Sequence, residues 1–104
     1  MLSALETRAL SDLRAALSAR FGVRLEQLVL FGSRARGEGH ADSDLDVLVL
    51  VQELAREERR AVQDVAGSIE EEYGIVISPM VRDAGSWSPD SPIAHAIREE
   101  GHAF

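Results

Sequence analysis

The sequence contains no cysteine, which excludes disulfides, thiolate catalysis and cysteine-ligated zinc sites. It also has no apolar run near the roughly 20 residues that a membrane-spanning helix needs. The first residues lack the charged and apolar profile of a signal peptide, and no internal repeat or low-complexity segment is present. These absences predict a cytoplasmic protein without a membrane interaction.

Basic residues are also few. The chain has 11 Lys and Arg against 18 Asp and Glu, which gives a formal net charge of −7. A general nucleic-acid binder shows a basic face, so this balance argues against direct nucleic-acid binding. An acidic surface suits a basic protein partner better. With 104 residues the chain predicts one domain, 1–104, that buries about two-thirds of its unfolded surface.

Two short apolar runs, 28–31 and 47–51, lie at the centre of the sequence. Runs of this length that end at glycine or begin after polar residues favour buried strands. Asp44 and Asp46 come at the start of the second run. Because strand side chains alternate, both carboxylates are expected on one face of the sheet, with Leu45 pointing into the core.

Two neighbouring carboxylates repel each other unless a positive group lies between them. Mg²⁺ prefers oxygen ligands and is often held by one or two carboxylates together with substrate phosphates. Gly32 allows close backbone approach, and Ser33 offers a hydroxyl where free N–H groups can face an anion. Arg34 and Arg36 add positive charge for phosphate oxygens. This stretch therefore predicts a site for Mg²⁺ and a nucleotide.

The same residues carry a resemblance. Gly32-Ser33, then Arg34-Ala35-Arg36-Gly37, then Ser43-Asp44-Leu45-Asp46 resembles the signature of the nucleotidyltransferase superfamily of DNA polymerase beta. The small size looks like the minimal nucleotidyltransferase branch, the antitoxin partner of HEPN-domain toxins. The resemblance implies an α+β fold with a small mixed sheet of about three strands covered by helices, in the order α-β-α-β-α-β-α.

The resemblance also implies an activity. AMP would pass from MgATP to a hydroxyl, most simply a tyrosine, of a partner HEPN RNase toxin, and this modification would neutralise the toxin in a hetero-oligomer. Asp44 and Asp46 would be the catalytic and metal-binding residues. The nucleotide-binding residues would be Gly32, Ser33, Arg34, Arg36 and Ser43. Two alternatives remain open: an antitoxin that acts by binding alone, and a transferase acting on a small molecule of the aminoglycoside type.

The flanking segments predict helices over 1–20, 53–73 and 92–100, with Ser3 and Glu6 forming a capping box at the start of the first. Gly22 is expected in the left-handed conformation after the first helix, and Gly74 is expected to end the second. A short helix is expected after Gly32. His40 is a candidate phosphate contact, although a solvated loop residue is the simpler interpretation, and Asp42 is expected in a turn.

The third strand, predicted at 75–81, raises a difficulty. Polymerases of this superfamily use a third carboxylate on this strand, and the matching position here is Ser78. A hydroxyl is a weak magnesium ligand and a poor general base near neutral pH. Asp83 is an alternative third acid if the chain loops back. Pro79 cannot donate to a sheet ladder and therefore marks an edge strand or a bulge.

Overall fold

The computed structural model describes residues 2–39 and 43–104, so the expectations for His40 and Asp42 lie outside the described residues. The helices and strands follow the order α1 (Ala4–Phe21), β1 (Leu25–Phe31), β2 (Leu45–Val51), α2 (Arg56–Tyr73), β3 (Ile77–Asp83), α3 (Pro92–Glu100) and β4 (His102–Ala103), with short 3₁₀ turns at Gly22–Arg24 and Ala84–Ser86.

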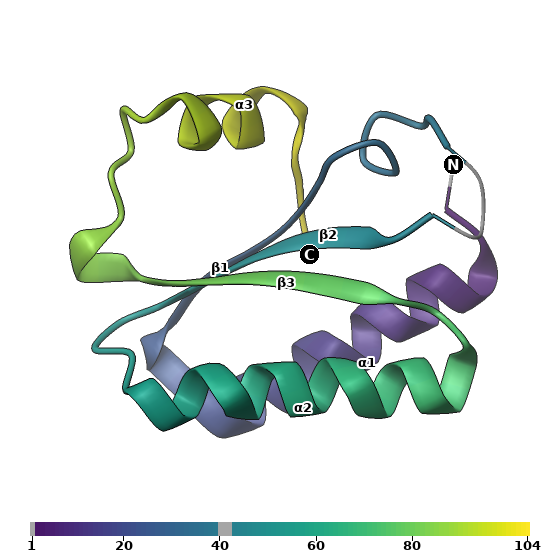
Figure 1. Cartoon of the computed structure of the whole chain (residues 1–104), viewed down its shortest axis with the longest axis horizontal. Coiled ribbons are helices and arrows are strands. Elements are labelled where there is room, and N and C mark those ends of the chain that lie inside the picture. Colours follow the sequence, from purple (N-terminus) through teal and green to yellow (C-terminus); the bar gives the residue numbers. More distant parts are fainter. Residues whose placement is uncertain (1, 40–42) are drawn as a thin grey trace.

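The strands form one mixed sheet in the order β3-β2-β1-β4. β1 is antiparallel to β2 and to β4, whereas β2 and β3 run parallel. Figure 1 shows α1 and α2 side by side on one face of the sheet, and α3 on the other. β3 is an edge strand, which is where a strand proline is tolerated, so the prediction from Pro79 is confirmed.

α1 begins with the capping box that the sequence predicts. The Ser3 hydroxyl accepts a hydrogen bond from the Glu6 N–H at 3.1 Å, and a Glu6 carboxylate oxygen accepts one from the Ser3 N–H at 2.8 Å. This reciprocal pair is the predicted capping box. Gly74 ends α2, as predicted, and it does so in the left-handed conformation at φ 69°, ψ 17°. The left-handed conformation expected at Gly22 is wrong, because its positive φ of 56° is combined with a ψ of −129°, outside that region.

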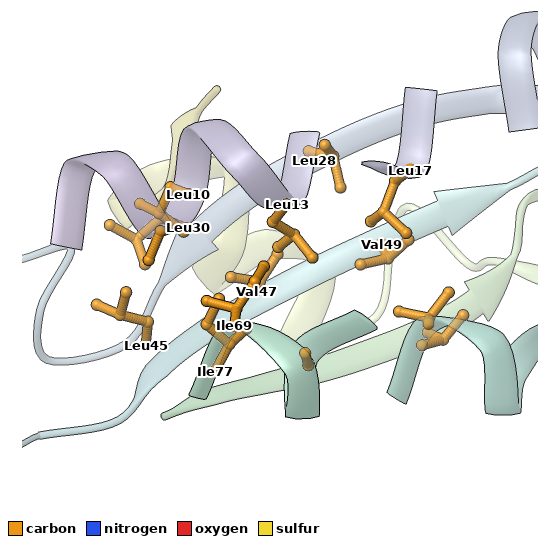
Figure 2. Packing of buried hydrophobic residues seen from close by; sticks show 14 of the residues in the cluster. Leu10, Leu13, Leu17, Leu28, Leu30, Leu45, Val47, Val49, Ile69 and Ile77 are labelled. Carbon is orange, nitrogen blue, oxygen red and sulfur yellow. The ribbon is translucent and has the colours of Figure 1, made fainter. Parts of the chain in front are cut away.

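The main core lies between the sheet and the α1–α2 layer. Alternate residues of β2 point into it, and Leu13 and Leu17 of α1 pack over them. Figure 2 shows the residues that meet in this layer: Leu10, Leu13, Leu17, Leu28, Leu30, Leu45, Val47, Val49, Ile69 and Ile77. Burial of these side chains accounts for most of the driving force for folding.

The opposite face of the sheet has a smaller apolar cluster. Val29, Leu48 and Ile97 are buried there, with the partly buried Trp87 packed against them. Because residues alternate along β2, Asp46 shares this face with Leu48. The acidic pair therefore belongs to the side that carries α3.

The predicted α+β class and small mixed sheet are confirmed, but two details of the predicted order are wrong. The segment after Gly32 forms hydrogen-bonded turns rather than a helix, because positive φ angles at Gly32 and Gly37 (79° and 76°) interrupt helical geometry. The chain also adds a fourth strand, β4, whose two residues pair with Val29 and Leu30.

α2 begins three residues later than predicted. Glu53 has a positive φ of 51°, so the chain turns there before the helix starts. The Leu54 N–H donates to Asp83 at 2.9 Å and the Ala55 N–H donates to Glu58 at 2.8 Å, which satisfies donors at the helix start. In the part of the chain that the structure describes, no helix is long and apolar enough to cross a membrane.

Candidate active site

The two strand pairings of β2 place Asp46 beside two specific neighbours. Asp46 is opposite Phe31 in the antiparallel pair with β1 and opposite Ser78 in the parallel pair with β3. Asp44 lies just before the strand, and its carboxylate accepts a hydrogen bond from the Ser78 hydroxyl at 3.1 Å. The acidic pair and the end of β1 therefore meet at one end of the sheet.

Gly32 packs directly against Asp46, the second acid of the pair. Its φ of 79° is in the region that favours glycine, and a Cβ added there would collide with the Oδ2 atom of Asp46. Glycine is therefore needed at this bend both for its backbone conformation and for the space that the Asp46 carboxylate occupies. The glycine-serine turn and the acid that sequence reasoning paired with it are in contact.

The environment of Asp46 disfavours its charge. Partial burial raises the pKa of its carboxyl, and the nearby Asp44 carboxylate raises that pKa further. A partly desolvated acid beside a second acid is typical of a site whose counter-charge arrives with a ligand.

The third position of the predicted acidic set is a hydroxyl. Ser78 lies beside Asp46 in register, as predicted, and donates to Asp44. The alternative in which Asp83 loops back as a third acid is excluded, because Asp83 pairs with Val51 at the far end of β3 and accepts a hydrogen bond from the Leu54 N–H. The described residues contain no group of three or more His, Asp or Glu side chains placed to hold a metal ion.

Two serine hydroxyls converge near the bend. A Cβ added to Gly39 would lie 2.8 Å from the Ser43 hydroxyl oxygen and 3.4 Å from that of Ser33. Ser33 and Ser43 therefore approach the same glycine from the two ends of the connection between β1 and β2. Ser43 directly precedes Asp44 in the sequence, and Ser33 directly follows Gly32.

The two arginines of the turn have different surroundings. Arg34 is buried, with 7% of its surface exposed, and its guanidinium binds Glu6 of α1 at 2.9 and 2.6 Å. Arg36 is more exposed and binds Glu38 at 3.3 Å and Glu100 at 2.9 Å. Arg36 is thus the more accessible of the two guanidinium groups, whereas Arg34 holds the turn to the first helix.

Three residues that anchor this turn were missed by sequence reasoning. They are Glu6, Glu100 and His102, the last of which forms a hydrogen bond of 2.9 Å between its Nε2 and the Ala35 carbonyl oxygen. Of the three, only Glu6 could be singled out in the sequence, because it belongs to the predicted capping box. Its role as a cap partner gave no reason to expect a second contact with Arg34. The others come from the far end of the chain.

The residues present fit Mg²⁺. Asp44, Asp46 and the neighbouring hydroxyls supply the hard oxygen atoms that Mg²⁺ prefers, and a site with two carboxylates leaves positions for water and substrate phosphates. A different feature of the molecule, a cavity of about 340 Å³ between α1, β1 and the end of the chain, is lined by residues such as Leu10, Leu30 and Phe104 and by no predicted site residue. Of the two acids, Asp44 is exposed and Asp46 is half-buried.

Comparison with known proteins agrees with this geometry. The family described as "Nucleotidyltransferase domain" matches residues 10–83, a span that includes the turn, both aspartates and Ser78. This chain belongs to that family.

Two curated relatives from Methanocaldococcus jannaschii are each named "putative protein adenylyltransferase". One is 39% identical over 59 residues, which covers 56% of this chain and 60% of the relative. The other is 30% identical over 76 residues, covering 73% of this chain and 72% of the relative. This chain thus spans less than two-thirds of the first relative's length.

Solved structures show the same fold. One described as a "putative minimal nucleotidyltransferase" is 29% identical, with a TM-score of 0.62, and the match covers 96% of this chain and 95% of that one. This match confirms the expected resemblance to minimal nucleotidyltransferases.

Two other matches share the fold at lower identity. A chain of a toxin–antitoxin complex with AMP-PNP is 22% identical (TM-score 0.60; 88% and 69% covered). A chain of a complex between a tri-AMPylated HEPN toxin from Shewanella oneidensis and an MNT antitoxin is 16% identical (TM-score 0.52; 91% and 70% covered).

Proposed function

We propose that this protein transfers AMP from MgATP to a hydroxyl group of a partner HEPN toxin and thereby neutralises it. The observation that carries the proposal is the contact between Gly32 and Asp46, with Asp44 beside them. This contact brings together the acid that we expect to bind metal and the turn that we expect to bind phosphate. The partner proposal is supported by the fold shared with chains of toxin–antitoxin complexes.

The chain's own residues have defined tasks in this reaction. Asp44 and Asp46 would hold Mg²⁺, which would neutralise charge on the phosphates. Ser33, Ser43 and the backbone at Gly32 bind phosphate oxygens, and Arg36 stabilises their charge. Arg34 is not among the phosphate ligands, because its guanidinium is committed to Glu6.

The transfer itself is a displacement at the α-phosphorus of ATP. The acceptor oxygen forms a bond to this phosphorus, the bond to the bridging oxygen of the β-phosphate breaks, and pyrophosphate leaves. The acceptor's proton passes to solvent, which reaches the exposed Asp44 side of the site. Most of the protein's contribution is positioning and electrostatic stabilisation. A tyrosine hydroxyl is the acceptor we expect.

Mass spectrometry of the partner tests the proposal. The protein is incubated with its toxin, ATP and Mg²⁺, and the expected result is a mass gain of one or more AMP units on the toxin. Asp44→Asn and Asp46→Asn are expected to reduce the transfer rate by at least about 100-fold, as loss of a principal metal ligand or charge-stabilising group does. Asp64→Asn, an exposed acid on α2, is the matched control and should retain the wild-type rate.

A second candidate is an antitoxin that acts by binding alone. Ser78 favours it, because a hydroxyl stands beside Asp46 in the register and is a weak metal ligand and base. The two functions differ in one measurement. If Asp44→Asn and Asp46→Asn neutralise the toxin as well as the wild type does, binding alone is the function. If neutralisation is lost together with the AMP mass gain, transfer is the function.

A further inference from the structure

The Glu6–Arg34 ion pair is the most deeply buried charged contact among the described residues. The two side chains are 0% and 6% exposed. Arg34 Nε donates to one carboxylate oxygen at 2.9 Å and Nη2 donates to the other at 2.6 Å. The hydrogen bond to Arg34 is the main reason that the pKa of Glu6 lies below its usual value. Both groups are therefore charged in the folded protein.

This pair joins two structures that are 28 residues apart in the sequence. On one side, Glu6 also accepts the Ser3 N–H at the capped start of α1. On the other side, Arg34 Nη1 donates to the Glu38 carbonyl at 3.2 Å, while the Glu38 N–H donates to the Ser33 carbonyl at 2.9 Å. The Arg34 guanidinium thus links both ends of the turn 33–38 to the capped start of α1.

Such a pair is a poor way to gain stability alone. Moving two charges out of water costs free energy that their attraction often fails to recover, and apolar residues of similar volume are frequently as stable or more so. The planar, bidentate geometry does fix one orientation of the turn. A site for a nucleotide needs that order, because small displacements of binding groups cost large factors in rate.

We propose that Glu6 and Arg34 are positioning residues, whose buried ion pair holds the turn 33–38 in the conformation that receives the nucleotide phosphates. Neither side chain contacts the substrate. The effect of the pair on nucleotide binding rests on the proposed function. Its effect on the order of the turn does not.

The test replaces the charged side chains of Glu6 and Arg34 with apolar side chains that fill a similar volume. The double variant Glu6→Leu with Arg34→Met removes both charges, and we expect its thermal stability to stay close to that of the wild type. We expect KM for ATP to rise about tenfold with a smaller change in kcat. In the free protein, hydrogen exchange at the amides of residues 33–38 should become about tenfold faster, with exchange in β2 unchanged.

A second ion pair serves as the matched control. Arg24 binds the Glu58 carboxylate with two nitrogens, at 3.1 and 2.5 Å, and joins the start of β1 to α2. Neither residue has been placed in the site. Arg24→Met with Glu58→Leu should leave KM for ATP and exchange in the turn unchanged.

Arg34→Lys is a second variant in case the apolar pair does not fold. It keeps the buried charge but cannot make the bidentate contact, so the turn should again exchange faster. Wild-type KM and wild-type exchange in a stable variant would overturn the proposal. If the wild type itself binds no ATP, the proposed function fails, and the exchange rates of the turn alone decide whether the pair positions it.

Discussion

Gly32 combines an unusual backbone conformation with a close contact to a candidate metal ligand. Its positive φ and its contact with the Asp46 carboxylate both exclude a side chain. We predict that Gly32→Ala lowers the free energy of unfolding by about 1–3 kcal/mol, since alanine is strained at this φ and displaces Asp46. Chemical denaturation measures the loss.

Gly67 provides the control for this prediction. It lies in α2 with open space around its Cβ position. Gly67→Ala should therefore stabilise the protein by about 0.5–1 kcal/mol, because alanine is the better helix former. If Gly32→Ala and Gly67→Ala changed the free energy of unfolding equally, a side chain at Gly32 would neither strain the backbone nor displace Asp46.

Asp46 should make the ligand-free protein less stable at neutral pH. Its pKa is raised in the folded state, so the folded protein binds this proton more readily than the unfolded chain does. The ionised carboxylate consequently costs stability above the folded pKa, and this cost disappears as the pH falls through that value.

We therefore predict that Asp46→Asn raises Tm at pH 7 by roughly 2–4 °C, the shift that about half a kcal/mol gives in a domain of this size. Calorimetry at several pH values is the measurement. The gain should shrink on acidification. A Tm that falls at pH 7 would mean that the carboxylate has a stabilising partner.

Ser78 occupies the position at which a substitution would add a third carboxylate to the pair Asp44 and Asp46. Ser78→Asp would place a third carboxylate beside Asp46 and remove the hydroxyl that donates to Asp44. We predict a lower Tm without metal, because like charges repel. We also predict a larger rise in Tm on adding Mg²⁺ and a faster transfer rate. An unchanged response to Mg²⁺ would exclude this position from the site.

At the scale of elements, the end of the chain determines the surroundings of the turn. Glu100, the last residue of α3, binds Arg36, and His102 of β4 binds the Ala35 carbonyl. These contacts form because β4 pairs with β1 and returns the chain to the turn (Figure 1). The free protein thus already neutralises the arginine that we expect to bind phosphate.

Glu100 of α3 and a nucleotide phosphate would compete for the Arg36 guanidinium. Glu100→Gln should strengthen ATP binding by about two- to threefold, the range that loss of one exposed ion pair allows, because the phosphate no longer displaces a carboxylate. Titration calorimetry measures the affinity. Glu99→Gln, which changes a neighbouring exposed acid paired with His95, should have no effect. Weaker binding in Glu100→Gln would instead mean that Glu100 orients Arg36 for the phosphate.

At the scale of the whole molecule, two ion pairs contribute stability that is lost in acid. The hydrogen bond from Arg24 is the main cause that lowers the pKa of Glu58 to about 2, and that from Arg34 lowers the pKa of Glu6. Lowered folded-state values mean that these acids stabilise the protein above their usual pKa of 4.5 and lose that contribution as the pH falls below it.

We predict that the free energy of unfolding falls between about pH 4.5 and 2, and that Glu58→Gln makes this fall shallower. Urea unfolding across this range is the measurement. Glu57→Gln, a neighbouring exposed acid on the same helix, should leave the slope unchanged. A wild-type slope in Glu58→Gln would show that the ion pair with Arg24 does not form in solution.

The sequence by itself determined the local structure and the identity of the acids. Apolar runs and alternation predict β1 and β2 and place Asp44 and Asp46 at a strand start, and the capping box predicts the beginning of α1. These features follow from residues within a few positions of one another. The α+β class and the nucleotidyltransferase family also follow from the central motif, because that motif is local.

Only the tertiary structure decided which charged groups meet. It paired Arg34 with Glu6, placed Asp83 at the far end of β3, and brought Glu100 and His102 to the turn. Each of these contacts joins residues that are distant in the sequence. Their formation depends on strand order and register, which the packing of the whole chain determines.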